Sequence, residues 1–224
     1  MLDLLTGVRG ESLSLDAYGE DFERRFATLR DAPVWKLERR QTFHQPESAS
    51  WMRYRAGQAE EALRMLELDR PGLVELFSGL QSRGSQVLRV RVVDFPLTPY
   101  LRWELHSLHI RAQCGEHIRV IGPQTIAHLE EEEEVPEVLT LGDQVTYRIR
   151  YDADGVLAGS VRHTDPALTV RCSEQIAALY RDAEPLETFF PREVAAAANE
   201  CATAPTSRPG CGTVPTTTAQ EEDR

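Results

Sequence analysis

The chain has 224 residues, of which 41% are hydrophobic, and its formal net charge at neutral pH is −11. This composition excludes a wholly disordered protein, and the length suits one folded domain with a tail. Its longest apolar runs, such as Val194 to Ala198, are far shorter than the roughly 20 residues that cross a bilayer, and residues 1–15 lack the pattern of a secretory signal, so we expect a cytoplasmic protein without membrane contact.

The first half of the chain alternates between helical and strand patterns. Tyr18, Phe22 and Phe26 recur every four residues, which predicts a helix with one apolar face. Residues 86–121 read strand, helix, strand, which indicates a parallel crossover. The predicted elements are a helix over 18–29, a strand over 34–43, helices over 46–68 and 71–82, a strand over 86–93, a helix over 99–111 and a strand over 116–121.

The second half begins with an acidic segment and then changes to short strands. Glutamates 130–134 predict a solvated loop, because adjacent like charges repel. Three strands separated by tight-turn residues predict an antiparallel meander, and Asp165 can cap a final helix that runs to about residue 183. Phe189 and Phe190 can pack back onto the body. The predicted strands cover 138–141, 145–151 and 156–162.

These elements predict an α/β (α+β) fold with a mixed central sheet flanked by helices. The residues before the first helix, 1–17, are expected to form an N-terminal extension, and residues 18–192 a single globular domain. Residues 193–224 are rich in Thr, Pro and Ala, which is typical of a disordered tail.

The negative charge is unevenly distributed along the chain. Residues 130–137 contain six glutamates, and residues 199–224 contain four acidic residues against two arginines. The rest of the chain is therefore nearly balanced, and the total charge does not decide whether one face is basic. Lysine occurs once, as Lys36, and arginine supplies the other basic residues. Arginine binds carboxylates or phosphates through two parallel hydrogen bonds where lysine cannot.

Four arginines on two strands are the first candidate binding site. Arg89 and Arg91 lie two residues apart on one predicted strand, so their side chains point to the same face. Arg148 and Arg150 have the same spacing on another strand. If these strands are neighbours, the four guanidinium groups share a surface that suits an anion, a phosphate backbone or an acidic partner. The alternative is a solvated sheet face whose arginines pair with local glutamates.

The helix over 99–111 is the second candidate. Arg102, His106 and His109 are four and three residues apart and can share one side of the helix, with Glu104 displaced from them. Histidine titrates near neutral pH, so the two histidines could act as acid and base. Trp103 could stack on a base or ring. The alternatives are surface histidines and a core tryptophan.

No metal or cofactor is expected. The cysteines form no pair with the spacing of a zinc site, and we expect ordinary free thiols. A calcium loop that begins at Asp152 would need glutamate where the chain has His163. The cysteines are Cys114, Cys172, Cys201 and Cys211.

Several blocks between residues 20 and 185 carry a family resemblance. They are Asp21-Phe22 with Phe26, Trp35 to Glu38, Arg89 to Val93, Pro96-Leu97, Tyr100 to Glu104, and Gly115-Glu116 with Ile118. On these residues the chain resembles an uncharacterised actinobacterial family, a domain of unknown function that is often encoded near helix-turn-helix regulators. The resemblance implies a role beside such a regulator.

Residues 138–186 are also similar to the closing unit of phospholipase-D-like domains, including catalytically silent versions attached to bacterial regulators. Active members use a histidine two residues before a lysine. The single lysine here, Lys36, has Val34 at that position. This resemblance implies a sandwich around a mixed sheet without that chemistry.

The leading hypothesis is a non-enzymatic accessory or sensor domain of a bacterial regulatory system. It would bind a protein partner, such as a helix-turn-helix regulator, or an anionic ligand; nucleic acid is an open but less favoured partner. The binding residues would be Arg89, Arg91, Arg102, Trp103, Arg148 and Arg150.

The alternative is a phosphodiester hydrolase or nuclease. It would use His106 or His109 as acid and base near Glu104, with arginines holding the phosphate. The discriminating feature is whether these histidines and arginines meet in one cleft.

Overall fold

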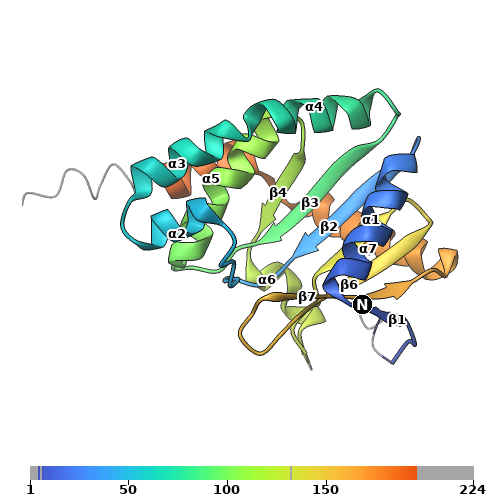
Figure 1. Cartoon of the computed structure of the whole chain (residues 1–224). Coiled ribbons are helices and arrows are strands. Elements are labelled where there is room, and N and C mark those ends of the chain that lie inside the picture. Colours follow the sequence, from blue (N-terminus) through green and yellow to red (C-terminus); the bar gives the residue numbers. More distant parts are fainter. Residues whose placement is uncertain (1–4, 6, 132, 196–224) are drawn as a thin grey trace, which may run out of the picture.

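A mixed sheet of eight strands forms the centre of the computed structural model, which describes residues 5, 7–131 and 133–195 (Figure 1). The strands lie in the order β1-β7-β6-β5-β2-β3-β4-β8. This arrangement confirms the predicted α/β class with a mixed central sheet. The strands are β1 (Glu11–Leu13), β2 (Pro33–Glu38), β3 (Gln86–Val92), β4 (His117–Ile121), β5 (Val138–Leu141), β6 (Val145–Tyr151), β7 (Leu157–His163) and β8 (Glu184–Pro185).

The sheet has a parallel part and an antiparallel part. Strands β2, β3 and β4 run parallel, and α5 (Pro99–Gln113) connects β3 to β4 as the predicted crossover. On the other side of β2, strands β5, β6 and β7 form the predicted antiparallel meander. The two edge strands, β1 and β8, are the short elements that the apolar pattern does not reveal. Strand β2 therefore lies where the two parts of the sheet meet.

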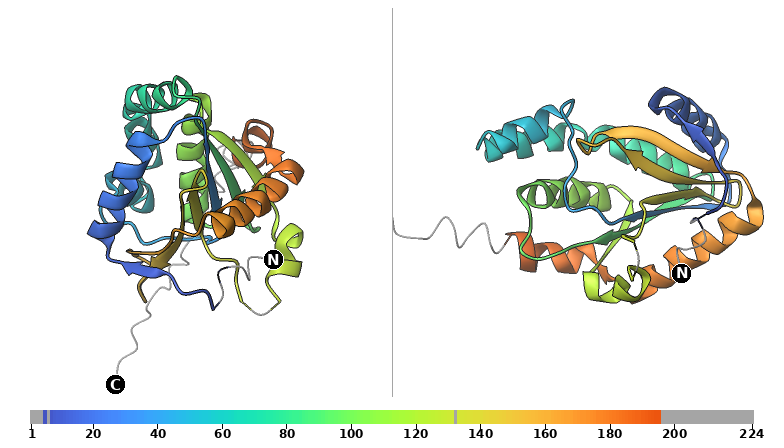
Figure 2. Two further views of the ribbon diagram at one scale, coloured as in Figure 1. Left: turned by 90° about the vertical axis from the view of Figure 1, so that its right-hand side faces the viewer. Right: turned by 90° about the horizontal axis from the view of Figure 1, so that it is seen from below.

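Helices cover both faces of the sheet, which Figure 2 shows as three layers. Helix α7 (Pro166–Asp182) packs on one face, the back face, against Leu37, Val90 and Val138. The opposite face, the front face, carries α1 (Leu15–Thr28) over β7 and α5 over β4. The remaining helices are α2 (Ala49–Arg55), α3 (Ala59–Leu68), α4 (Arg70–Gln81), α6 (Pro123–Ile126) and α8 (Leu186–Phe190).

Helix α5 is buried on several sides. Tyr100, Trp103 and Ile110 face α2 and α3, whereas Leu101 and Leu105 pack with β4 and α8. A helix that is apolar around most of its circumference lies inside the molecule. The side chain of Thr98 accepts a hydrogen bond from the Leu101 amide and caps this helix. Helix α5 therefore lies between the sheet and the helices α2 and α3 on the front face.

Several element boundaries differ from the predictions. The helix predicted over 46–68 is two helices, α2 and α3, because Gly57 adopts a left-handed backbone with φ of 81° between them. Strand β1 and buried Leu5 belong to the folded body, which therefore begins before residue 18. Phe189 and Phe190 are buried on the body as expected. The tail predicted for 193–224 lies outside the described residues from 196 onward.

Among the described helices, none has both the length and the hydropathy that a membrane span requires.

We predict that Gly159→Ala destabilises the fold. Gly159 has a φ of +123°, and a Cβ there would lie 2.9 Å from the Ser14 carbonyl carbon and closer still to the Leu13 carbonyl oxygen. The substitution therefore pushes β1 away from β7, at a cost of about 2 kcal/mol or more in the free energy of unfolding. Urea denaturation measures this cost.

Gly19→Ala is the matched control, because Gly19 lies within α1 and a Cβ there would meet nothing within 4 Å. Alanine in a helix should stabilise the protein by about 0.5–1 kcal/mol. Equal effects of the two substitutions would contradict the tight docking of β1 on β7.

Candidate functional site

The four candidate arginines do not share one face of the sheet. Arg89 lies opposite Lys36 on the neighbouring strand, Lys36 opposite Leu139, and Leu139 opposite Tyr147. Residues opposite each other point to the same face, so Arg89 and Tyr147 both point to the front face. Arg148 follows Tyr147 and points to the back face, since side chains alternate along a strand. Strands β2 and β5 also separate β3 from β6. The predicted common surface of Arg89 and Arg91 with Arg148 and Arg150 is therefore wrong.

Arg91 is fully buried, and its guanidinium group is saturated with hydrogen bonds. Its Nε and Nη2 donate to one carboxylate oxygen of Glu104 at 2.9 and 2.8 Å. Its other bonds go to the backbone carbonyls of Glu38 at 3.3 Å, Arg40 at 2.6 Å and Val92 at 2.9 Å. A guanidinium group has five N–H donors, and all five are used. Arg91 thus ties α5 to the end of β2 and has no donor left for a ligand.

Arg89 is buried between two carboxylates. Its Nε donates to Glu116 and its Nη1 to Glu38, both at 2.6 Å. Glu38 also forms an ion pair with Lys36 at 2.6 Å, and Glu116 accepts a second bond from Arg111. We call Lys36, Glu38, Arg89, Arg91, Glu104, Arg111 and Glu116 the buried ionic network.

Burial and ion pairing have opposite effects on the pKa values of the carboxylates in this network. Burial alone would raise the pKa of Glu38, but the positive charges of Arg89, Lys36 and Arg91 hold that pKa below its ordinary value. Burial raises the pKa of Glu104, because Arg91 only partly compensates for lost hydration. Burial would also raise the pKa of Glu116, yet Arg89 and Arg111 lower it. Each of these carboxylates has at least one cationic partner.

The candidate residues of α5 are distributed over separate environments. His106 and His109 contact the ring of Phe190 on α8, with centroid distances of 5.0 and 4.1 Å, and His109 stacks parallel to it. Burial lowers the pKa of both histidines. Glu104 instead faces Arg91. The histidines and the β3 arginines therefore do not meet in one cleft.

The other candidates are placed by local contacts. Trp103 is buried among aromatic rings, and its indole N–H donates to the Ser50 hydroxyl at 2.9 Å, so it is a core residue. Arg102 is half-buried on α5. On β6, Arg148 is half-buried and Arg150 donates to the Leu13 carbonyl at 3.1 Å.

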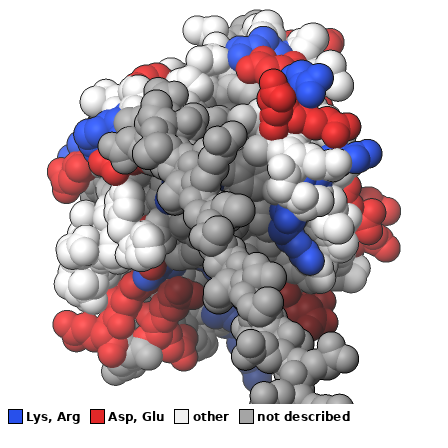
Figure 3. Space-filling model, turned by 90° about the vertical axis from the view of Figure 1, so that its left-hand side faces the viewer, with Lys and Arg blue, Asp and Glu red and all other residues white. Residues whose placement is uncertain are grey.

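The surface in Figure 3 shows the end of the molecule that lies at the left of Figure 1. On the described residues of this side, acidic and basic side chains alternate, and no extended basic patch stands out. Binding of a nucleic-acid backbone relies on such patches. The described residues visible in this view therefore form no surface of that kind.

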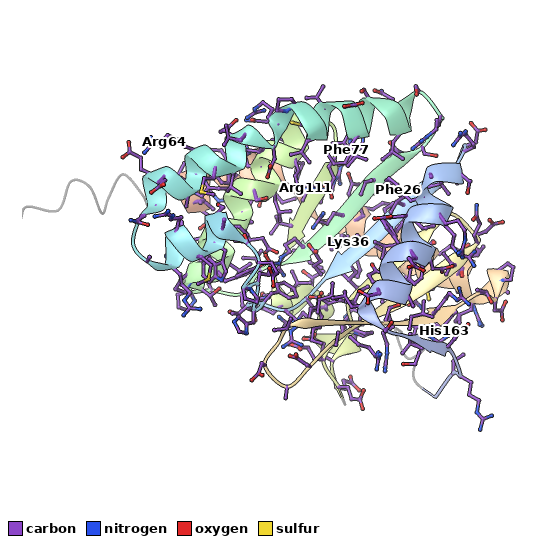
Figure 4. The ribbon with its side chains drawn as sticks, in the orientation of Figure 1. Phe26, Lys36, Arg64, Phe77, Arg111 and His163 are labelled. Carbon is purple, nitrogen blue, oxygen red and sulfur yellow. The ribbon has the colours of Figure 1, made fainter. Side chains whose placement is uncertain are left out.

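A cleft of about 660 Å³ opens on the front face beside the buried ionic network. It lies over β2, and Figure 4 shows Lys36 at this place, between α1 and α5. Residues 43–48, which follow β2, form one wall, and the turn between β6 and β7 forms another. The lining includes Leu15, Tyr18, Lys36, Glu38, Phe43, His44, Glu104, Glu137, Leu139, Ile149, Tyr151, Val156 and Leu157.

The segment after β2 is held in place by many bonds. The Glu137 carboxylate accepts the amides of Arg39 and Arg40 at 3.3 and 3.0 Å. The Gln41 side chain donates to the Val92 carbonyl at 3.0 Å and accepts from the Asp94 amide at 2.8 Å. Together with the carbonyls bound by Arg91, these contacts fix residues 38–41, which lead into the cleft wall at residues 43–48.

Glu137 differs from the other buried carboxylates of this region in its bonding partners. It is 5% exposed and lines the cleft, and its second oxygen accepts the hydroxyl of Tyr151. Within residues 7–131 and 133–195, no basic side chain forms an ion pair with it. Burial and the nearby charge of Glu38 raise the pKa of Glu137 to about 7.

Metal-ligand side chains do not cluster in the part of the chain that the structure describes: no group of three or more His, Cys, Asp or Glu could hold an ion there. Cys114 and Cys172 are free thiols, and Cys201 and Cys211 lie outside the described residues.

Apart from Glu104, the residues of the cleft were not among the sequence candidates, although one signal could have indicated them. Lys36 and Glu38 alternate with apolar residues on β2, as Arg89 and Arg91 do on β3, and the registers pair Lys36 with Arg89 and Glu38 with Arg91. Charges on two central strands of a sheet that is covered on both faces must be buried and paired.

We predict that Arg91→Lys destabilises the fold by about 3 kcal/mol, because lysine keeps the charge but lacks the planar fork, and each buried acceptor left without a donor costs about 1–3 kcal/mol. Glu104 and three carbonyls would lose donors. Urea denaturation measures the loss. Arg64→Lys on the exposed surface of α3 is the control and should change stability by less than about 0.5 kcal/mol. Equal effects of the two variants would contradict the role of Arg91.

We predict that Glu137→Gln stabilises the protein at pH 8 relative to the unsubstituted chain, and much less at pH 5. The folded-state pKa of about 7 lies above the ordinary value of 4.5, so the protonated carboxyl contributes stability that is complete below pH 4.5 and lost as the pH rises through 7. The neutral amide avoids this loss, which amounts to at most about 3 kcal/mol. Denaturation at both pH values measures it.

Glu134→Gln is the control for this pH dependence, because Glu134 is exposed and close in sequence. A stability difference between Glu137→Gln and the unsubstituted chain that is the same at pH 5 and pH 8 would show that Glu137 does not titrate in this range.

No curated protein matches the sequence. A family model, described as a domain of unknown function (DUF6879), matches residues 20–191, which is well over half of the 224 residues. The match includes the buried ionic network and most residues of the cleft. The chain therefore belongs to the DUF6879 family of domains of unknown function.

Proposed function

We propose that this chain is a non-enzymatic accessory or sensor domain of a bacterial regulatory system, and that it acts by binding a small molecule in the cleft on the front face. The observation that carries this proposal is the cleft itself, about 660 Å³ in volume, with an apolar and aromatic lining and a few convergent polar groups. Ligand sites typically have volumes of roughly 300–1,000 Å³ and this mixture of groups.

The position of the cleft supports the same function. Lys36 and Glu38 lie near the carboxyl end of β2, and residues 43–48 follow that end. In sheets with parallel strands, ligands bind outside the carboxyl ends of the strands, where the direction of the connections changes. Strand β2 has a parallel neighbour on one side and an antiparallel neighbour on the other. The cleft thus lies at the place where this type of sheet offers a site.

The rigidity of the walls also supports binding. Arg91 and Glu137 together bond four backbone groups between Glu38 and Arg40. Walls that are already fixed cost less entropy when a ligand binds, so a modest ligand can gain useful affinity. A pre-formed site is suited to sensing.

The regulatory part of the proposal comes from resemblance. The blocks from Asp21 to Ile118 resemble an actinobacterial family that is often encoded near helix-turn-helix regulators, and residues 138–186 resemble silent phospholipase-D-like domains. We therefore propose a cytoplasmic role beside a DNA-binding regulator, which would detect whether the cleft is occupied. The hydrolase alternative has no comparable support, because His106 and His109 contact Phe190 rather than the cleft.

We predict that Val156→Trp blocks ligand binding, because Val156 lines the cleft and an indole would fill part of it. The protein is incubated with a small-molecule extract of the native host, separated from unbound compounds by gel filtration, and denatured. Mass spectrometry should then identify a compound retained by the unsubstituted chain, released chemically unchanged, and absent from Val156→Trp.

Val170→Trp is the matched control, since Val170 is 42% exposed on α7 at the back of the sheet. It should retain the compound. A ligand site in the cleft would be contradicted if the unsubstituted chain retained no compound, or if both tryptophan variants retained equal amounts of it. Release of a chemically altered compound would contradict the non-enzymatic role.

Purification of the tagged chain from the host at physiological salt tests the proposed protein partner. Recovery of the chain alone would count against a regulator as the partner.

A further inference from the structure

We infer that the ligand of the cleft is a small organic cation, an ammonium or guanidinium group on an aromatic or apolar body, and that the Glu137 carboxylate is its counter-ion. This inference rests on the proposed function, because it names the chemistry of the molecule that the cleft would bind. The inferred ligand charge is opposite to the one expected from the sequence, where the arginines suggested an anionic ligand.

The pairing of the buried charges leads to this inference. Glu38 binds Lys36 and Arg89 at 2.6 Å each. Glu104 binds Arg91, and Glu116 binds both Arg89 and Arg111. Each of these three carboxylates therefore has at least one cationic partner inside the fold. Among the carboxylates of this region of the described chain, Glu137 is left without a cationic partner, although it is as deeply buried as the others.

An unpaired buried carboxylate is costly unless a positive charge reaches it. The donors that Glu137 accepts are the amides of Arg39 and Arg40 and the hydroxyl of Tyr151. None of these carries a formal charge. The side chain of Arg40 reaches the ring of Tyr151 at 4.6 Å but forms no ion pair with Glu137 in the described ranges. A cationic ligand in the cleft would supply the missing charge.

The walls of the cleft suit the body of such a ligand. Tyr18, Phe43 and Tyr151 line it, and the rings of Phe43 and Tyr151 lie 5.2 Å apart. Aromatic faces attract organic cations, more strongly where water is excluded. Leu139 and Ile149 continue the apolar surface. The same walls would accept a neutral molecule, so the charge of the ligand is decided by Glu137.

Among the described residues that line this cleft, no lysine or arginine is left unpaired for an anionic ligand. Lys36 is bound to Glu38, and the other residue of the lining with a basic side chain is His44. The five donors of Arg91 are used, and Arg89 lies beneath the floor between Glu38 and Glu116. An anion would also meet Glu38, Glu104 and Glu137 at close range. Like charges in a region of low dielectric repel strongly.

Three probes of nearly equal shape test the inference: 2-phenylethylamine, which is cationic at neutral pH, 2-phenylethanol, which is neutral, and phenylacetate, which is anionic. Each is titrated into the full chain, and binding is followed by backbone amide NMR signals of the cleft. We expect the amine to bind at least about tenfold more tightly than the alcohol, because a charge-assisted hydrogen bond adds that order of affinity. Phenylacetate should bind most weakly.

Glu137→Gln should weaken amine binding by about tenfold or more and change alcohol binding by less than about twofold, since the amide removes the charge and keeps the shape. Glu134→Gln should change neither. Because the amide at position 137 removes a buried charge, this variant remains folded at the pH of the titration.

The outcomes separate this inference from the proposed function. If the alcohol or phenylacetate binds in the cleft at least as tightly as the amine, the ligand is not a cation, and the ligand-binding function stands. The same holds if Glu137→Gln leaves amine binding unchanged. If no probe shifts the cleft signals, both the inference and the proposed cleft function are overturned.

Discussion

The buried guanidinium group of Arg91 is the interaction on which the site depends. It joins three parts of the front face: β3, which carries it, α5 through Glu104, and the carbonyls of Glu38 and Arg40 at the end of β2. A charge without water is tolerated only when every donor has a partner, so these groups can adopt few other arrangements. Together with Glu137, this side chain fixes the path of residues 38–40, from which the chain continues into the cleft wall at residues 43–48.

A buried ion pair adds little net stability, because desolvation offsets much of the attraction, and apolar residues of the same volume often serve as well. The network on the front face is therefore better understood as a positioning device. Leucine at position 91 could fill the space below α5, but it could not bind two backbone carbonyls of the segment after β2. The cost of burying Arg91 is offset by a defined path for a segment that has no regular secondary structure. That path is what gives the cleft a fixed wall.

The fold could be predicted largely from local patterns, and the site could not. The crossover β3-α5-β4 and the meander β5-β6-β7 follow from apolar periodicity, turn residues and helix caps, all of which act within a few residues. Strands β1 and β8 have three and two residues and depend on distant pairing partners, so no local pattern marks them. The arginine pairs were assigned correctly to single faces of their strands. Their relation to each other depended on β2 and β5 lying between them, which only the sheet order reveals.

Glu137 illustrates what is missing from a sequence. It follows closely after an acidic run, and its residue type is the same as that of exposed Glu134. What distinguishes it is its tertiary contacts: its carboxylate accepts the amides of Arg39 and Arg40, nearly a hundred positions earlier in the chain, and the hydroxyl of Tyr151 donates to its other oxygen. Because Glu38, Glu104 and Glu116 each have their own cationic partner, the proposed ligand would bind Glu137 without breaking an ion pair of the fold. A charge used for structure and a charge available for binding can thus lie side by side in one cleft, and the hydrogen-bond partners of each decide which is which.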